Sequence, residues 1–120
     1  MAEKKFSLTY REKLHLQKDF TKILKNGVKI ENQIIKIFAY KNLNSANRRI
    51  GLITSKKVGK AHIRNRTKRR LREIFRTNKY FLQEGIDLIF ISKPKTAAAN
   101  YEDLKKTIIE LLKKAGLYRI

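Results

Sequence analysis

KKVGKAHIRNRTKRRLREIFR, residues 56–76, holds ten Lys or Arg residues and a single acid, Glu73. Within it, apolar residues recur at helical spacing, which predicts an amphipathic helix over 61–78. Its expected buried stripe is Ile63, Thr67, Leu71, Ile74 and Phe75. At about 100° per residue, the residues pointing away from this stripe are Asn65, Lys68, Arg69, Arg72 and Arg76, with Arg64, Arg66 and Arg70 at its flanks.

This arrangement predicts an external anion. Like charges three and four positions apart repel one another on a helix, whereas a merely solvated face mixes the two signs. Six of the ten cations are arginines, whose planar guanidinium can hold a phosphate through two hydrogen bonds and can also stack on a base. The segment therefore favours nucleic acid as the partner.

The rest of the chain predicts helices and strands on both sides of this segment. Apolar spacing at Leu16, Phe20, Ile23 and Leu24 indicates a helix over 17–26, with Asn26-Gly27 as a left-handed stop. The expected strands are 28–31, 33–41, 48–54 and 86–92, and Asn100 is expected to cap a last helix that Gly116 ends. The core stripe of that helix is Tyr101, Leu104, Ile108, Leu111, Leu112 and Ala115. The order αβββαβα predicts an α/β (α+β) two-layer sandwich.

Length and composition limit the class of protein. At 120 residues we expect one domain, 1–120, in which 1–15 form an extended basic N-terminal segment. The net charge of +20 predicts adhesion to polyanions and stabilisation by bound anions. There is no cysteine, and no apolar run approaches the length of a membrane span or a signal sequence. We therefore expect a cytoplasmic protein.

Residues for catalysis or metal binding are not grouped in the sequence. His15 and His62 are far apart, and the adjacent acids Glu102 and Asp103 are explained by their favourable place in the first turn of the last helix. No glycine-rich phosphate loop of the Walker type is present. We expect no catalytic residue and no metal ligand, and hence a binding protein.

The run SKKVGKAHIRNRTKRRLREIF, preceded by RRIGL, closely resembles the RNR motif of the bacterial ribonuclease P protein component. The shared features include the Ser55-Lys56-Lys57 loop, Gly59, the Arg64-Asn65-Arg66 triplet and Lys68-Arg69 in one register. The resemblance continues in Asp19-Phe20, Asn26-Gly27, Lys93-Pro94 and the YEDLKK of the last helix, and so covers most of the chain.

This resemblance implies a small protein that joins a catalytic RNA to remove the 5′ leader of precursor tRNA. The RNA subunit performs the chemistry with Mg²⁺ that it chiefly binds itself, and no further protein partner is required. By the family pattern, the residues expected to contact the catalytic RNA are Lys56, Lys57, Lys60, Arg64, Asn65, Arg66, Lys68, Arg69 and Arg72. The resemblance also implies a mixed sheet with a left-handed crossover through the basic helix, against the usual preference.

The family also has a cleft between the first helix and the sheet that receives the single-stranded leader. Phe20, Leu24 and Phe38 stand at the matching positions, and strand alternation adds Ile34 and Tyr40 to the Phe38 side. Aromatic side chains can stack on unpaired bases without selecting a sequence. Packing of the first helix onto the sheet would by itself account for Phe20 and Leu24, so their role stays open at this point.

Three other functions are compatible with the composition. A different structural RNA-binding protein, such as a ribosomal protein, fits the charge and fold class but not the ordered motif. A DNA-binding nucleoid protein would place the basic helix in a major groove. Membrane-surface binding would need a large exposed apolar face, which the sheet can cover here.

Overall fold

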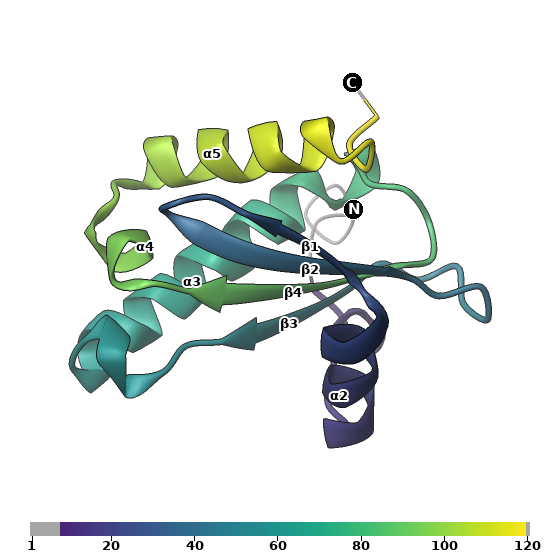
Figure 1. The fold of residues 1–120 in the computed structure, drawn as a ribbon, viewed down its shortest axis with the longest axis horizontal. Helices are drawn as coiled ribbons and strands as arrows, with labels where there is room; N and C mark the ends of the chain where they lie inside the picture. The colour runs from purple at the N-terminus through teal and green to yellow at the C-terminus, as the bar shows by residue number, and fades with distance from the viewer. Residues whose placement is uncertain (1–7, 120) are drawn as a thin grey trace.

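The computed structural model describes residues 8–119. A four-stranded mixed sheet with the spatial order β1-β2-β4-β3 forms its centre (Figure 1). The strands are β1 (Val28–Glu31), β2 (Ile35–Lys41), β3 (Arg49–Ile53) and β4 (Ile86–Ser92). The helices are α2 (Gln17–Asn26), α3 (Ala61–Asn78), α4 (Pro94–Ala98) and α5 (Tyr101–Lys114). Three short 3₁₀ turns complete the described chain, namely η1 (Tyr10–Glu12), η2 (Lys56–Val58) and η3 (Lys79–Phe81).

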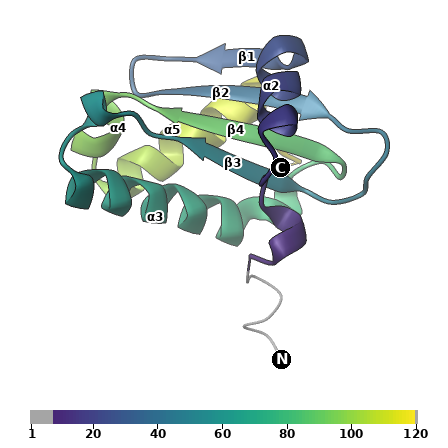
Figure 2. The same ribbon diagram turned by 90° about the horizontal axis from the view of Figure 1, so that it is seen from below.

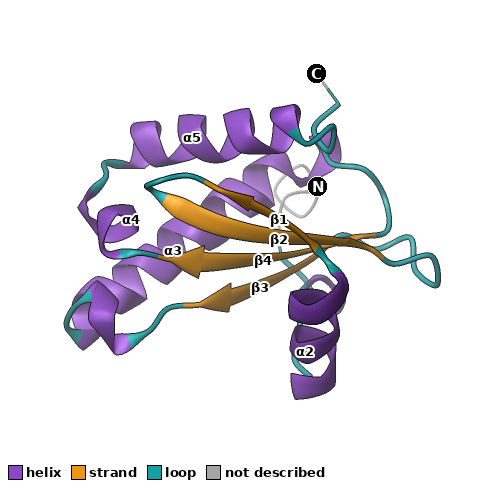
Figure 3. Ribbon diagram, viewed as in Figure 1, coloured by secondary structure: helices purple, strands orange, loops and turns teal. Residues whose placement is uncertain are grey.

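Helices cover both faces of the sheet (Figure 3). The main core lies under α3 and α5, where Ile37 of β2 and Phe90 of β4 pack against Leu71 and Leu104. On the other face α2 buries Ile23 against Ile89. β4 is thus buried on both sides, which explains its continuous apolar sequence. The predicted α+β sandwich is confirmed, with α2 as a partial additional layer.

The basic helix α3 connects two parallel neighbouring strands, β3 and β4. Figure 2 looks onto the face that α2 covers, and there β3 and β4 run in the same direction, with β3 at the edge and α3 running back beside it. The buried residues of α3 pack on the other face of the sheet, with Ile37 and Phe90. The crossover is therefore left-handed, as the resemblance implies.

The end of α2 differs from the prediction. Gly27 does not adopt the left-handed conformation, since its φ of −74° and ψ of 162° are extended. A Cβ on Gly27 would lie 2.5 Å from the carbonyl oxygen of Ile23 and 3.0 Å from that of Ala39. Glycine is therefore needed here for close approach of two backbones, and not for a positive φ.

Other predicted positions shift because tertiary contacts override local pattern. Leu16 is 53% exposed because it is the N-cap of α2, and Leu14 takes the core position beside Ile23.

The start of β2 also differs from the prediction. Ile34 lies outside β2 and packs on the α3–α5 side, so it does not share the Phe38 side as predicted. The Asn32 side chain accepts hydrogen bonds from the backbone N–H groups of Ile34 and Ile35, which delays the start of the strand. Ala115 is exposed because α5 ends at Lys114.

The described part of the N-terminal segment is ordered and not simply extended. After the η1 turn, Lys13 forms a parallel bridge with Ile50 of β3, and the Leu14 N–H donates to the Ile50 carbonyl at 2.9 Å. Glu12 pairs with Lys79 at 2.9 Å, and Lys79 is only 2% exposed. These contacts fix the segment along the β3 edge. Within residues 8–119, no helix has both the length and the apolar character to cross a membrane.

Candidate nucleic-acid interface

The exposed surface of α3 carries most of the predicted phosphate-binding residues. Thr67, Leu71, Ile74 and Phe75 are buried, which confirms four positions of the predicted stripe, whereas Ile63 in the first turn is half-buried. The positions exposed on this helix include Asn65, Arg66, Arg69 and Arg72, and those half-buried include Arg64, Lys68 and Arg70. Arg66 is thus more outward than the helical wheel predicts. The burial of one face therefore fixes the direction of the charged face.

Three arginines of α3 are engaged within the protein. Arg64 donates to the Gly59 carbonyl at 3.1 Å, and Arg70 donates to the Ala99 carbonyl at 3.2 Å. Arg76 pairs with Glu73, and this hydrogen bond lowers the pKa of the Glu73 carboxyl. Within residues 8–119, the following α3 cations make no hydrogen bond or ion pair to another side chain or to the backbone: Arg66, Lys68, Arg69 and Arg72. Their charges are available to a partner.

A short loop extends the cationic surface ahead of α3. Lys56 and Lys57 form the η2 turn, and together with Lys60 they are exposed. Gly59 has a φ of 150°, and a Cβ there would lie 3.1 Å from the Ile63 side chain. Glycine therefore lets the chain turn tightly from η2 into α3, which places the three lysines beside the first turn of the helix.

The other face of the sheet bears a half-open apolar surface next to α2. Strand pairing places Phe38, Ile89 and Gly51 in one row, with Lys36, Ile91 and Ile53 in the next. Phe38, Ile53 and Ile91 are half-buried and pack around the buried Ile89. Since α2 covers only one end of this face (Figure 1), the second row continues the surface beyond the helix. We call Phe20, Leu24, Phe38, Tyr40, Ile53 and Ile91 the cleft residues.

The structure brings the four predicted leader-binding residues into this one cluster, although their surroundings differ. Phe20 lies on Gly51, where a Cβ would come within 2.7 Å of its ring. Leu24 and Phe20 both remain half-buried on α2. The ammonium of Lys22 lies 5.2 Å from the Tyr40 ring centroid and covers part of that ring. Phe38 is thus half-buried in the same cluster, and no cation lies over its ring within residues 8–119.

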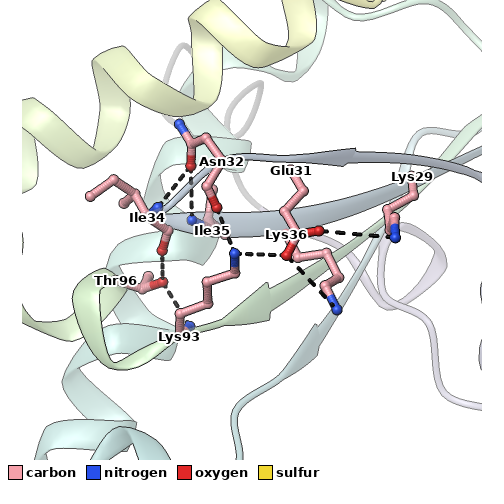
Figure 4. A network of polar contacts seen from close by, with 8 residues as sticks. All are labelled: Lys29, Glu31, Asn32, Ile34, Ile35, Lys36, Lys93 and Thr96. Carbon is pink, nitrogen blue, oxygen red and sulfur yellow. Dashed lines mark hydrogen bonds and ion pairs between the residues drawn. The ribbon is translucent and has the colours of Figure 1, made fainter.

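A polar network borders the far end of the cleft residues (Figure 4). Lys93 pairs with Glu31 at 2.7 Å and donates to the Asn32 carbonyl at 2.6 Å. Lys29 and Lys36 approach the same carboxylate at 4.0 Å, and the hydrogen bond from Lys93 is the main cause that lowers the pKa of Glu31. The Thr96 hydroxyl also donates to the Ile34 carbonyl. The Lys93-Pro94 segment therefore fastens the β1–β2 turn to α4.

An ion-pair network anchors α2 at the opposite end. Arg49 makes two hydrogen bonds to Asp87, at 2.8 and 2.7 Å, and Asp87 is 1% exposed. The same guanidinium approaches Asp19 of α2 at 3.7 Å. Because Arg49 and Asp87 lie in the row next to Phe38, this network sets the position of α2 over the cleft residues.

The two histidines are separate and have ordinary surroundings. His15 stacks on Tyr10 with ring centroids 3.9 Å apart, whereas His62 is exposed in the first turn of α3. Within residues 8–119, no three His, Asp or Glu side chains gather closely enough to hold a metal ion. Within the same residues, six acids pair with cations, namely Glu12, Asp19, Glu31, Glu73, Glu84 and Asp87.

Sequence reasoning missed Ile53 and Ile91 as members of the cleft. The alternation of side chains along a strand predicts which residues share one face of the sheet. Only the pairing of β2 and β3 with β4 shows that Ile53 and Ile91 lie beside Lys36. It also missed the Arg49–Asp87 pair, because the two positions are 38 residues apart in the chain. No local pattern in the sequence predicts that Arg49 and Asp87 form an ion pair.

Comparison with known proteins gives one family. A family model described as Ribonuclease P matches residues 8–116. The chain is 37% identical over 107 residues to the ribonuclease P protein component of Clostridium botulinum (strain Langeland), covering 88% of this chain and 96% of that relative. It is 39% identical over 106 residues to that of Caldanaerobacter subterraneus subsp. tengcongensis, covering 88% and 90%.

Solved structures agree with the sequence relatives. A Staphylococcus aureus RNase P protein mutant with defective mRNA degradation activity has a TM-score of 0.84 and 26% identity, covering 90% of this chain and 91% of that one. The RNase P protein from Thermotoga maritima has a TM-score of 0.77 and 33% identity, covering 87% and 97%.

Proposed function

The chain belongs to the ribonuclease P protein component family, and from this premise we propose that it is the RNA-binding subunit of a ribonuclease P holoenzyme that removes the 5′ leader of precursor tRNA. Ribonuclease P is an endoribonuclease, and the protein takes part in tRNA processing. The observation that supports the RNA-binding role best is the row of exposed, unengaged arginines on α3, in a chain of net charge +20.

The catalytic RNA is the partner of the α3 surface in this proposal. Arg66, Arg69 and Arg72 supply guanidinium groups for phosphates, and Asn65 lies among them with hydrogen-bonding groups of both kinds. The flanking contacts come from Lys56, Lys57, Lys60, Arg64 and Lys68. Arg64 has a second role, because it also holds the Gly59 carbonyl and so stabilises the loop that presents the lysines.

The leader of precursor tRNA is the partner of the cleft residues. Phe38 offers a stacking surface for an unpaired base, worth about 1–3 kcal/mol. Ile53 and Ile91 continue the apolar floor, and Phe20, Leu24 and Tyr40 border it. Stacking and apolar contact do not depend on base identity, which suits leaders of varied sequence.

The metal of the reaction belongs to the RNA subunit in this proposal. The acids Glu12, Asp19, Glu31, Glu73 and Asp87 all hold cationic side chains, so this set does not fit Mg²⁺, which prefers free carboxylate and water oxygens. We assign no chemical step to a side chain of this protein. Residues 1–120 act as one RNA-binding domain in the cytoplasm, without a membrane and without another obligate protein partner.

A reconstitution with omissions tests the proposal. The purified protein, the candidate catalytic RNA from the same cell, Mg²⁺ and a precursor tRNA are combined, and each is left out in turn. We expect removal of the 5′ leader only when RNA, Mg²⁺ and substrate are present, with the protein increasing the rate at low substrate concentration. Leader removal by nuclease-free protein without the RNA, or no effect of the protein on the RNA's activity, would contradict it.

A further inference from the structure

A separate hollow lies between the N-terminal segment and α3. It has a volume of about 220 Å³ and lies over the β3 edge. Its cationic lining comes from two segments distant in sequence, with Lys13 from the N-terminal segment and Lys68 and Arg72 from successive turns of α3. The rest of the lining is Leu14, His15, Phe20, Ile50, Gly51 and Leu52.

Among residues 8–119, the cations that line this hollow have no counter-charge within it, because no carboxylate of that range is among the lining residues. The acids nearest in the chain are engaged elsewhere, since Glu12 pairs with Lys79 and Asp19 approaches Arg49. Cations gathered in a concave site repel one another and focus a positive potential, and a bound anion relieves both effects.

Lys13 is held in place before any ligand arrives. The backbone on either side of it is fixed by the bridge to Ile50, by the Leu14 hydrogen bond to Ile50 and by burial of the Leu14 side chain at 7% exposure. The Glu12–Lys79 pair ties the segment to the far end of α3. Binding by such a segment does not require ordering of the backbone, which lowers the entropic cost of the contact.

We propose that Lys13, Lys68 and Arg72 together bind one RNA phosphodiester in this hollow, so that the RNA interface extends from α3 onto the N-terminal segment. This inference rests on the proposed function, because it takes the ligand to be RNA of the holoenzyme. Since Phe20 borders both this hollow and the cleft, the site joins the catalytic-RNA surface to the leader surface. The phosphodiester comes from the catalytic RNA or from the leader, and both present the same group.

The first test measures the salt dependence of two binding reactions of Lys13→Gln: binding of the protein to the catalytic RNA, and binding of the holoenzyme to precursor tRNA. The matched control is Lys106→Gln, an exposed lysine of α5 that lies beside Glu102 and Glu110. We expect Lys13→Gln to reduce the slope of log K against log salt by roughly 0.7–0.9, the value for one lost phosphate contact, and the control to leave it unchanged. Equal slopes for both variants and the parent in both binding measurements would overturn the inference, while a steep parental slope for the catalytic RNA would still support the proposed function.

The second test locates the RNA directly. The chain has no cysteine, so Lys13→Cys provides a single attachment point for a tethered iron chelate that cleaves nearby RNA. In the holoenzyme with precursor tRNA, we expect specific cleavage of the catalytic RNA or of the leader, and the cleaved strand identifies the source of the phosphate. Cleavage no stronger than that from Lys106→Cys would overturn the site. Thermal unfolding of each variant confirms that the fold is retained.

Discussion

At the residue scale, Phe38 lies at the boundary between packing and binding. It stands opposite Ile89 and Lys29 in the sheet, and it is half-buried in the cleft cluster. Phe90 offers a contrast, since it lies on the other face of the sheet and is 1% exposed. Substitution of each phenylalanine by alanine therefore tests a different effect. At Phe90 it leaves a cavity in the core, and at Phe38 it removes a surface that could bind the leader.

We predict that Phe38→Ala weakens holoenzyme binding to leader-bearing tRNA by about 1–3 kcal/mol, with little change for mature tRNA. Phe90→Ala should instead lower the free energy of unfolding by about 3–5 kcal/mol and, while folded, keep the discrimination between the two substrates. Binding and thermal unfolding are measured on both variants. If Phe38→Ala unfolds much earlier but discriminates as the parent does, the residue is part of the core.

The Glu12–Lys79 pair gives a prediction about pH. Burial acts to raise the pKa of Glu12, but hydrogen bonds from Lys79 and Thr9 together outweigh it, so the pKa lies below its ordinary 4.5. A carboxyl with a lowered pKa in the folded state stabilises the fold above its unfolded pKa, and this contribution is lost as the pH falls through the folded value.

We therefore predict that Glu12→Gln is less stable than the parent at pH 7, by about 1–3 kcal/mol, because the buried Lys79 loses a charged partner. The difference should shrink as the pH falls below about 4.5, where the parent's Glu12 becomes protonated. Urea unfolding between pH 3 and 7 measures it. A difference that stays constant over this range would show that the negative charge of Glu12 does not contribute to stability.

At the scale of elements, α3 was largely predictable from sequence. The helical repeat of its apolar residues defines the buried face, and it thereby places most of the cations on the exposed face. Its buried positions and its bounds follow from the apolar spacing. The wheel could not show that Arg64 and Arg70 bond to the carbonyls of Gly59 and Ala99, because those acceptors are placed by tertiary structure. The same reason explains why Gly27 was assigned to the wrong conformation.

At the scale of the whole molecule, the candidate site depends on strand order more than on any single motif. Sequence alternation assigned Phe38 and Tyr40 to one face, but Ile53 and Ile91 join them only through the pairing of β2 and β3 with β4. The hollow at Lys13 likewise needs the N-terminal segment to lie along β3, which no spacing in the sequence indicates. The resemblance implies a leader-binding cleft, and the structure shows that Phe20, Leu24, Phe38 and Tyr40 lie in one hydrophobic cluster with Ile53 and Ile91.

The left-handed crossover has a consequence for the distribution of charge. Figure 2 shows α3 along one edge of the sheet, beside β3, and α2 over the face toward the viewer. The exposed cations of α3 point away from the sheet, and the cleft residues lie on the face that α2 covers. An RNA bound along α3 and a leader bound in the cleft would therefore approach from different sides. The hollow between the N-terminal segment and α3 lies between them.

The central claim is that the outward face of α3 binds the catalytic RNA through its phosphates. The most direct measurement is the salt dependence of that binding for Arg66→Gln, Arg69→Gln and Arg72→Gln combined. The control removes three charges from α5, as Lys105→Gln, Lys106→Gln and Lys114→Gln. We predict that the α3 variant loses roughly two to three units of the log–log slope, with the fold intact, and that the control keeps the parental slope. Equal slopes for the α3 variant and the parent would contradict the claim.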